Sequence, residues 1–412
     1  MSIGLDAADR TALPADHLSG CGPLRAAPHG GALPLRQQLY ESVRAAGRIS
    51  RAALAKELQV SPGSVTPAVS DFLAAGLLRE IPDDSAPTGR GRPPVTLGVV
   101  PEVGHVIGLK ISDHDHSAVL VDLAGRPVAS ASLARRGADR STGRILDEVE
   151  TLCARLLDGT PAPRLLGVGA GLPGIVDHEA GRVRWSPVLA ERDIPLAETL
   201  SRRLGHPVAV DNDANCLTMA ELWFGKGRHL PDFAVVTIEY GVGMGLVIGH
   251  APWRGAHGLG MELGHTKVQV DGALCRCGQR GCLEAYVADY ALVREAAVAL
   301  DGPLPDRGAM LATLYDQAKA GNDAARAIFD RAGRYLALGL ANVANLFDPR
   351  RIILSGSRMR YDYLYADAML AEMAALTLNP SPPVEVNAWD DLVWARGAAA
   401  LALAEATPGL LA

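Results

Sequence analysis

The chain has 412 residues, a formal net charge of −6 and an apolar share of 48%, which is enough to fill hydrophobic cores in two or three domains. Its longest apolar stretches, such as residues 168–176, fall well short of the ~20 residues that a membrane span needs. The N-terminus carries no basic region followed by an apolar run. These features argue against a membrane protein and against a nucleic-acid coat protein, and we expect a cytoplasmic protein with no membrane partner.

Charge is distributed unevenly along the chain. Residues 33–94 contain eight Arg and Lys against six Asp and Glu, so this segment carries about +2 and the remainder about −8. Any contact with DNA must therefore be local to this segment, although many solvated surfaces carry a similar balance. Residues 1–32 mix Ala, Gly, Pro and Asp without a sustained period and predict a disordered tail.

A winged helix-turn-helix is predicted over residues 33–100. Apolar side chains recur at helical spacing from Leu35, and Gly47 ends the run. Ser50 can cap a second, short helix, and Ser61 followed by a proline can cap a third. Two strand-like segments, 77–81 and 95–100, then flank a basic loop that predicts a wing. A generic three-helix module with a loose loop is the alternative, but caps, turn and wing together favour DNA binding.

The third helix is the expected reading element for DNA. We expect Ser64 and Thr66 to face base edges in the major groove and Ser61 to lie near the backbone. The wing arginines, Arg90 and Arg92, would contact phosphates or the minor groove. A proline within the helix, Pro67, removes one backbone hydrogen bond and leaves the register of the base-reading residues open.

Beyond residue 100, strand-like segments alternate with helical stretches, which predicts an α/β domain. The strand-like segments are residues 106–111, 117–122, 166–170, 208–210, 233–238 and 245–248.

A metal site is predicted from one histidine and a cysteine loop. His265 is followed by Cys275, Cys277 and Cys282, and one imidazole with three thiolates is a complete tetrahedral set without a position for an activated water. The other three cysteines stand alone, so a disulfide framework is not expected. We predict a structural Zn²⁺, with unpaired structural cysteines as the alternative.

Short polar side chains follow the strand at residues 208–210. Asp211, Asn212 and Asp213 stand at its carboxyl end and open a helix, a position that suits recognition of hydroxyl groups. Taken alone, such a segment is more often a helix cap.

These features together resemble the ROK family of repressors, open reading frames and sugar kinases, in particular its regulators of the xylose- and N-acetylglucosamine-repressor type. The resemblance rests on residues 211–215, the Glu262-Leu263-Gly264-His265 sequence, the cysteine loop and Glu284, and it covers residues 33–412. It implies an actin-like, sugar-kinase-like (ribonuclease H-like) fold. The first lobe would comprise residues 101–214 plus 396–412, and the second, zinc-bearing lobe residues 215–395.

The resemblance further implies a sugar bound between the lobes. Its expected contacts are Gly174, Asn212, Asp213, Glu262, His265 and Glu284. Carboxylates and an amide suit the hydroxyls of a pyranose, which both donate and accept hydrogen bonds. His265 can give one ring nitrogen to the metal and its other N–H to a hydroxyl or carboxylate. Ordinary surface acids remain the alternative for Glu262 and Glu284.

Two phosphate-binding loops depart from the pattern of the family's kinases. The first reads Asp-x-Gly-Gly-Thr in kinases, and here Lys110 takes the place of the aspartate. The second reads Gly-Thr-Gly-x-Gly in kinases, and here it begins with Glu239 and Tyr240, whose carboxylate and phenol oppose phosphate. Asp213, in the place of the kinases' catalytic base, is retained. Phosphoryl transfer also needs groups that position and neutralise the nucleotide, so we predict no enzymatic activity.

The predicted function is that of a sugar-responsive DNA-binding transcriptional regulator, a repressor by family resemblance, with activation left open. Its expected partners are operator DNA, a monosaccharide or sugar-derivative effector, and further copies of the chain in a homodimer or homotetramer. Two alternatives stay open. One is a sugar kinase that also binds DNA, and the other is a regulator whose effector is a partner protein.

Overall fold

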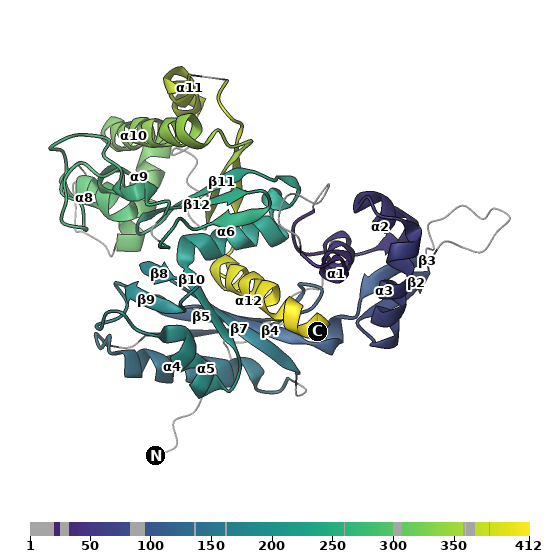
Figure 1. The fold of residues 1–412 in the computed structure, drawn as a ribbon. Helices are drawn as coiled ribbons and strands as arrows, with labels where there is room; N and C mark the ends of the chain where they lie inside the picture. The colour runs from purple at the N-terminus through teal and green to yellow at the C-terminus, as the bar shows by residue number, and fades with distance from the viewer. Residues whose placement is uncertain are drawn as a thin grey trace, which may run out of the picture. The chain divides into compact units, whose positions relative to one another are not determined.

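The computed structural model describes residues 20–24, 33–82, 95–135, 137–160, 163–258, 260–299, 307–356, 359, 367–378 and 380–412. The chain forms two compact units, and Figure 1 labels their elements. The first unit comprises Met1–Pro231 and Leu392–Ala412, and the second comprises Asp232–Asp391. Within the described ranges, no helix is both long enough and apolar enough to cross a membrane.

The first unit begins with the expected winged helix-turn-helix. Its elements are α1 (Leu35–Ala46), β1 (Ile49–Ser50), α2 (Arg51–Glu57), α3 (Pro62–Ala74), β2 (Leu78–Pro82) and β3 (Val95–Val99). The three strands form one antiparallel sheet in the order β1-β3-β2. The wing tip, with Arg90 and Arg92, lies outside the described residues.

Two serine caps set the helix-turn-helix, as expected. The Ser50 hydroxyl accepts a hydrogen bond from the Ala53 N–H at the start of α2, and Ser61 accepts one from Ser64 N–H at the start of α3. Each cap satisfies a backbone donor that the helix itself cannot pair. The buried face of α3 carries Val65, Val69 and Phe72.

A five-stranded sheet forms the centre of the first lobe, in the order β10-β7-β4-β5-β6. The strands are β4 (His105–Lys110), β5 (Asp115–Asp122), β6 (Pro127–Ala134), β7 (Leu165–Leu172) and β10 (Val208–Asn212). β4, β7 and β10 run parallel, whereas β5 and β6 run antiparallel to their neighbours. A small hairpin, β8 (Ile175–Asp177) and β9 (Arg182–Trp185), lies after β7, and a 3₁₀ turn, η2 (Pro101–Val103), precedes β4.

Helices cover both faces of this sheet (Figure 1). They are α4 (Thr142–Leu157), α5 (Leu196–Leu204), α6 (Asp213–Phe224), the short η3 (Lys226–His229) and α12 (Val393–Leu411). The C-terminal helix α12 lies directly on β4 and β7. A Cβ atom on Gly108 would come within 1.9 Å of the Ala395 carbonyl oxygen, so glycine is required for this close approach.

The first lobe extends beyond the expected boundary at residue 214. Helix α6 packs along α12 so closely that a Cβ atom on Gly397 would lie 1.7 Å from the Cys216 carbonyl oxygen. The two helices therefore share one core, and the first unit ends at Pro231 and resumes at Leu392. Both ends of the expected second lobe, residues 215–395, therefore belong to the first unit: residues 215–231 and 392–395.

Residues 20–24, expected within a disordered tail, are instead ordered against the first unit. Cys21 is 2% exposed, its N–H donates to the Arg44 carbonyl, and the Gly22 N–H donates to the Trp223 carbonyl. Gly125 makes room for the Cys21 thiol, since a Cβ atom there would lie 2.5 Å from the sulfur. The tail prediction is therefore wrong for these five residues, because their partners lie far away in the sequence.

The second unit holds another five-stranded sheet, in the order β13-β12-β11-β14-β15. Its strands are β11 (Phe233–Ile238), β12 (Val242–Ile248), β13 (Ala251–Trp253), β14 (Ile352–Gly356) and β15 (Val384–Ala388). Its helices are η4 (Leu263–His265), α7 (Glu284–Val287), α8 (Asp289–Ala299), α9 (Arg307–Lys319), α10 (Asp323–Phe347) and α11 (Asp367–Leu376). The sheet and the long α10 share one apolar core.

Candidate functional site

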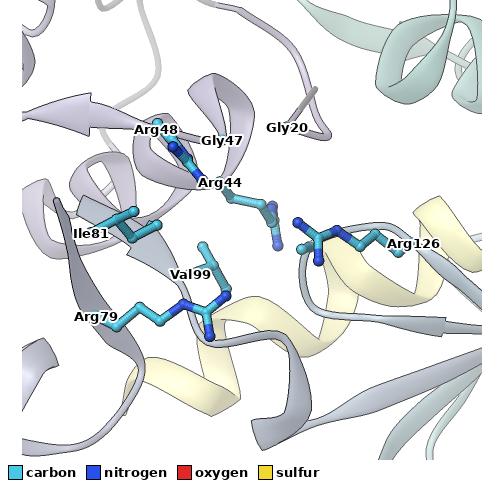
Figure 2. A pocket seen from close by; sticks show the side chains of 10 residues that line it. Gly20, Arg44, Gly47, Arg48, Arg79, Ile81, Val99 and Arg126 are labelled. Carbon is cyan, nitrogen blue, oxygen red and sulfur yellow. The ribbon is translucent and has the colours of Figure 1, made fainter. Parts of the chain in front are cut away.

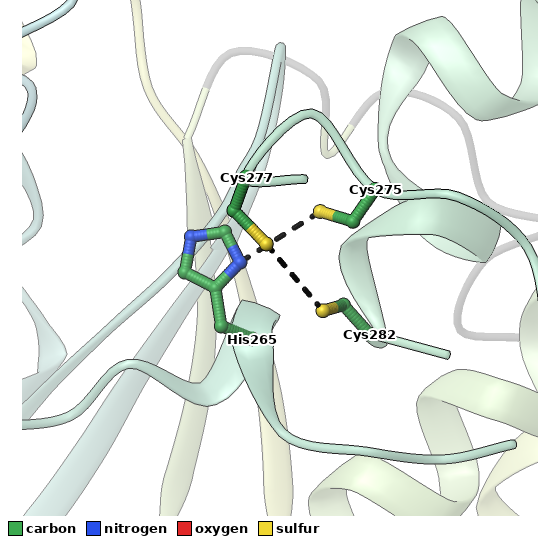
Figure 3. Close-up of side chains that lie close together, drawn as sticks. All are labelled: His265, Cys275, Cys277 and Cys282. Atoms are coloured by element: carbon green, nitrogen blue, oxygen red, sulfur yellow. Dashed lines mark hydrogen bonds between the residues drawn. The ribbon is translucent and has the colours of Figure 1, made fainter. Parts of the chain in front are cut away.

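The four predicted metal ligands converge in the second unit (Figure 3). The Nδ1 atom of His265 and the thiols of Cys275, Cys277 and Cys282 lie within 4.8 Å of one another. The Cys277 and Cys282 sulfurs are 3.7 Å apart. A tetrahedral zinc ion with Zn–S bonds of ~2.3 Å separates its sulfur ligands by about 3.8 Å, so these residues fit a structural Zn²⁺.

The His265 ring presents its two nitrogens to different partners. Nδ1 lies 3.8 Å from Cys275 Sγ, and Nε2 lies 4.0 Å from a carboxylate oxygen of Glu262. At 4.0 Å the Glu262 carboxylate is beyond hydrogen-bond distance of Nε2, and its side chain is half exposed. The Nδ1 side of the ring faces the cysteines, so the double role of His265 stays a prediction.

The cysteine loop is shaped by its glycines and by nearby donors. Gly281 has a φ of +77°, and a Cβ atom there would lie 1.9 Å from the Gln269 carbonyl oxygen. Lys267 Nζ lies 3.0 Å from Cys282 Sγ, and the Tyr290 hydroxyl donates to Cys275 Sγ at 3.6 Å. With a divalent ion bound, the lysine and the phenol donor would offset the negative charge that three thiolates leave around it.

Glu284 is buried beside the metal ligands, a role that sequence reasoning missed. One carboxylate oxygen lies 3.6 Å from Cys275 Sγ, and the other accepts a hydrogen bond from the Val242 N–H at 3.3 Å. The side chain is 9% exposed. Glu284 therefore links the metal loop to the β11–β12 turn. Sequence spacing carries no signal for this contact.

In the first unit, polar side chains gather where β10 ends and α6 begins. Asn212 Oδ1 accepts from the Ala214 N–H and so caps α6, while its Nδ2 donates to the Gly174 carbonyl at 2.7 Å. Asp211 Oδ1 accepts from Asn215 Nδ2 at 2.8 Å. The structure therefore brings Gly174, Asn212 and Asp213 together, and the capping role exists alongside any role in ligand binding.

Asp213 lies near Lys110, the residue predicted to replace the first aspartate of the kinases. Burial raises the pKa of Asp213, and hydrogen bonding by the Ala214 N–H and the charge of Lys110 partly oppose this. Lys110 Nζ itself lies 4.5 Å from the centre of the Trp394 ring, a cation–π distance.

The second loop brings Glu239 against a glycine of β14. A Cβ atom on Gly356 would lie 2.8 Å from a carboxylate oxygen of Glu239, so the two groups are in contact. The Glu239 N–H donates to the Gly241 carbonyl across the tight β11–β12 turn. Strand β12 starts at Val242 and not at residue 245, where the sequence predicted it. The prediction was late because alternating glycines hide the strand pattern. The space beside Gly356 is thus occupied by a carboxylate.

The exposed start of α3 forms the candidate nucleic-acid interface. Ser61, Ser64 and Thr66 are all exposed. The Ser61 and Ser64 hydroxyl oxygens are 2.9 Å apart, and the Thr66 hydroxyl donates to the Pro62 carbonyl at 3.0 Å. The Thr66 hydroxyl keeps its acceptor lone pairs, and Pro67 continues the exposed face.

Comparison with known proteins gives consistent matches. A family model described as ROK family matches residues 106–405. The DNA-binding transcriptional repressor Mlc of Escherichia coli (strain K12) is 32% identical over 77% of this chain and 79% of its own length. The glucokinase of Thermotoga maritima is 33% identical over 62% of this chain and 82% of its own length.

Among solved structures, a ROK family transcriptional regulator that is a homologue of the E. coli Mlc protein superposes with a TM-score of 0.76. The match covers 91% of this chain and 96% of that chain at 24% identity. It confirms the expected fold, a helix-turn-helix module followed by a sugar-kinase-like α/β domain. Because the ROK family model matches residues 106–405, which is more than half of the chain, the chain is a member of the ROK family.

Proposed function

We propose that this protein is a DNA-binding transcriptional repressor that responds to a monosaccharide or a sugar derivative. One observation carries the proposal: a winged helix with an exposed reading helix stands in the same chain as a ROK domain whose phosphate loops carry Lys110 and Glu239. The likeness to the repressor Mlc supports it, since that match extends over 77% of the chain.

DNA would be read by the start of α3. Ser64 and Thr66 offer hydroxyls to base edges and Ser61 to the backbone, with Arg90 and Arg92 of the wing on phosphates or in the minor groove. The Ser61–Ser64 contact keeps both hydroxyls oriented before DNA arrives. Operators of this kind of module are commonly two-fold symmetric, so we propose a homodimer or homotetramer acting in the cytoplasm.

The sugar would be held by residues of both units. In the first unit these are Gly174, Asn212 and Asp213, and in the second they are Glu262, His265 and Glu284. Asn212 is already hydrogen-bonded to Gly174, so its amide is held in place before a ligand binds. A ligand shifts regulation only through different affinities for two states of the protein, and a tenfold effect needs ~1.4 kcal/mol.

A structural zinc ion would tie the sugar contacts to the fold. The metal would be held by His265, Cys275, Cys277 and Cys282, and its closed coordination would supply rigidity rather than an activated water. Glu262 and Glu284 lie beside this set, so the ion would fix the positions of both carboxylates.

A sugar kinase that also binds DNA is the second candidate. Asp213 is retained, and the glucokinase of Thermotoga maritima is 33% identical. Against it stand the charge of Lys110 near Asp213 and the Glu239 carboxylate beside Gly356. Lys110 would repel Mg²⁺ and offers it no carboxylate ligand, and Glu239 would repel the triphosphate.

Three measurements on the full chain decide between these functions: selection of an operator, titration of sugars, and an assay for sugar phosphate formed from ATP. Selection of bound duplexes from a random pool identifies an operator, and a panel of hexoses, pentoses and their amino and phosphorylated forms is then titrated against that complex. We expect one sugar to change operator affinity at least tenfold, and no sugar phosphate to form with ATP and Mg²⁺. Sugar phosphate that disappears in Asp213→Asn would establish the kinase instead. If no sugar of the panel changes operator affinity, a partner protein is the favoured effector.

A further inference from the structure

Four arginines line a small pocket in the first unit, where the winged helix meets the first lobe (Figure 2). Arg44 lies in the last turn of α1, Arg48 follows that helix, Arg79 lies on β2, and Arg126 lies between β5 and β6. We call this cavity of about 60 Å³ the arginine pocket. The winged helix and the first lobe both contribute positive charge to this pocket, and like charges repel each other at such short range.

Acidic side chains are absent from the described lining of the arginine pocket. Among the described residues, none of its four arginines forms an ion pair. The nearby Asp122 uses one oxygen to accept the N–H groups of Ala124 and Arg126, both at 2.9 Å, and is not part of the lining. The charge of Arg126 also interacts with the Asp122 carboxylate. Within the described part of the chain, guanidinium groups are therefore in excess over carboxylates at this point.

Arg44 is the most informative of the four, because it is buried. It is 2% exposed, its Nη1 donates to the Thr407 hydroxyl at 2.8 Å, and its Nε has no hydrogen-bond partner. Figure 2 shows the guanidinium groups of Arg44 and Arg126 turned toward one another. A cation–π contact with the Trp223 ring, whose centre lies 4.6 Å from the Arg44 guanidinium, offsets part of the cost of burying this cation. The facing Arg126 cation adds to that cost, and an anion between the two would lower it.

We propose that the arginine pocket binds a phosphate-type oxyanion, either inorganic phosphate or the phosphoryl group of a small metabolite. Planar guanidinium groups match phosphate oxygens two at a time, which makes arginine the preferred side chain for this ligand. A cavity of roughly 10–15 Å³ holds one water molecule. About 60 Å³ therefore accommodates a group of the size of phosphate but not a sugar ring.

Two features of the lining favour a small ligand over the DNA backbone. Among the described residues, none from α3, the expected reading helix, lines the pocket, whereas Ala124 and Arg126 of the first lobe do. An anion held by both parts would stabilise the contact between winged helix and first lobe. If the chain is the repressor proposed above, the anion would then alter operator affinity in addition to the sugar.

The test is titration of inorganic phosphate into the full chain by calorimetry and thermal unfolding, at constant ionic strength maintained with chloride. We expect wild-type protein to bind and to be stabilised, and Arg126→Gln and Arg79→Gln to bind at least about tenfold more weakly, since a charge-assisted hydrogen bond is lost. The matched control is Arg182→Gln, a surface arginine paired with Asp193 away from the pocket.

Two results of the phosphate titrations would overturn the proposal, and a third comes from competition with DNA. One is stabilisation of the wild type by phosphate no greater than by chloride, and the other is equal binding by all variants. Arg79 is exposed, so its variant remains informative if Arg126→Gln fails to fold. Random-sequence duplex is added as a competitor, and one-for-one displacement of phosphate would identify the site as a DNA-backbone contact instead. The titration needs no operator, so its failure is distinct from failure of the proposed function.

Discussion

His116 Nε2 lies 3.2 Å from a carboxylate oxygen of Glu148 in the interior of the first lobe, and the His116 side chain is fully buried. Its other ring nitrogen, Nδ1, accepts a hydrogen bond from the Ser112 N–H at 3.2 Å. The ring must therefore be neutral, with its proton on Nε2. Arg135 and Arg144 also donate to Glu148, so its carboxylate is already neutralised without a charge on the histidine.

The free energy of unfolding should consequently fall in mild acid. Burial lowers the pKa of His116 below its ordinary value of 6.5, although Glu148 partly opposes the shift. The unfolded chain therefore takes up the proton first, and the stability that this residue contributes is full above pH 6.5 and lost as pH falls below it. Denaturant unfolding at pH 7.5 and 5.5 measures the effect.

The variant His116→Gln keeps a donor to Glu148 but cannot ionise. It should cost about 1–2 kcal/mol at pH 7.5 and lose less stability on acidification than the wild type does. The exposed His229→Gln serves as control and should keep the wild-type pH dependence. Identical pH profiles for all three proteins would show that another group governs acid unfolding.

Gly108→Ala should separate α12 from the sheet. The new methyl group would lie 1.9 Å from the Ala395 carbonyl oxygen and 2.4 Å from the Ala399 nitrogen, neither of which can move without shifting the helix. We expect a loss of about 3 kcal/mol in the free energy of unfolding. Gly143→Ala is the matched control. Nothing lies within 4 Å of its methyl group on α4, so it should be neutral or raise stability by about 0.5–1 kcal/mol.

Cys277→Ser should remove the proposed metal. Changes outside a coordination sphere cost roughly 10–100-fold in metal affinity, and loss of a direct ligand should cost at least as much. Elemental analysis should find about one zinc per wild-type chain and little in the variant, and thermal stability should fall. Cys153→Ala, a buried thiol outside the set, should keep its zinc. Zinc retained by Cys277→Ser would refute the ligand assignment.

The two parts of the DNA interface should behave differently. Arg92→Ala should weaken binding to every duplex and reduce the slope of log affinity against log salt by about 1, because one phosphate contact is lost. Thr66→Ala should change preference at one base position by about 1–3 kcal/mol. Competition binding on variant operators resolves both effects. Ser70→Ala, exposed further along α3, is the control, and wild-type behaviour of both test variants would place the interface elsewhere.

Sequence reasoning succeeded where structure depends on near neighbours. Ser50 and Ser61 each bond a donor three residues away, so their sequence context contains the whole cap. The metal ligands likewise fall within a segment of 18 residues, His265 to Cys282, in which spacing carries the signal. Helix-turn-helix, α/β class and cysteine cluster could all be predicted on these grounds.

Sequence reasoning failed where a residue packs against a partner that is distant in the sequence. Cys21 is buried against Gly125 and Arg44, and nothing in its own surroundings predicts that. The boundary of the first unit depends on α6 meeting α12, more than 160 residues later in the chain. The arginine pocket is similar, because Arg48 and Arg126 come together only after folding.

The C-terminal helix touches the DNA-reading module directly. Arg36 Nε donates to the Leu411 carbonyl at 3.2 Å, and Arg44 donates to the Thr407 hydroxyl. Leu411 is itself buried. A variant that lacks Thr407 and Leu411 would therefore lose both hydrogen bonds to α1, and a reporter strain that carries it would record repression by an altered molecule.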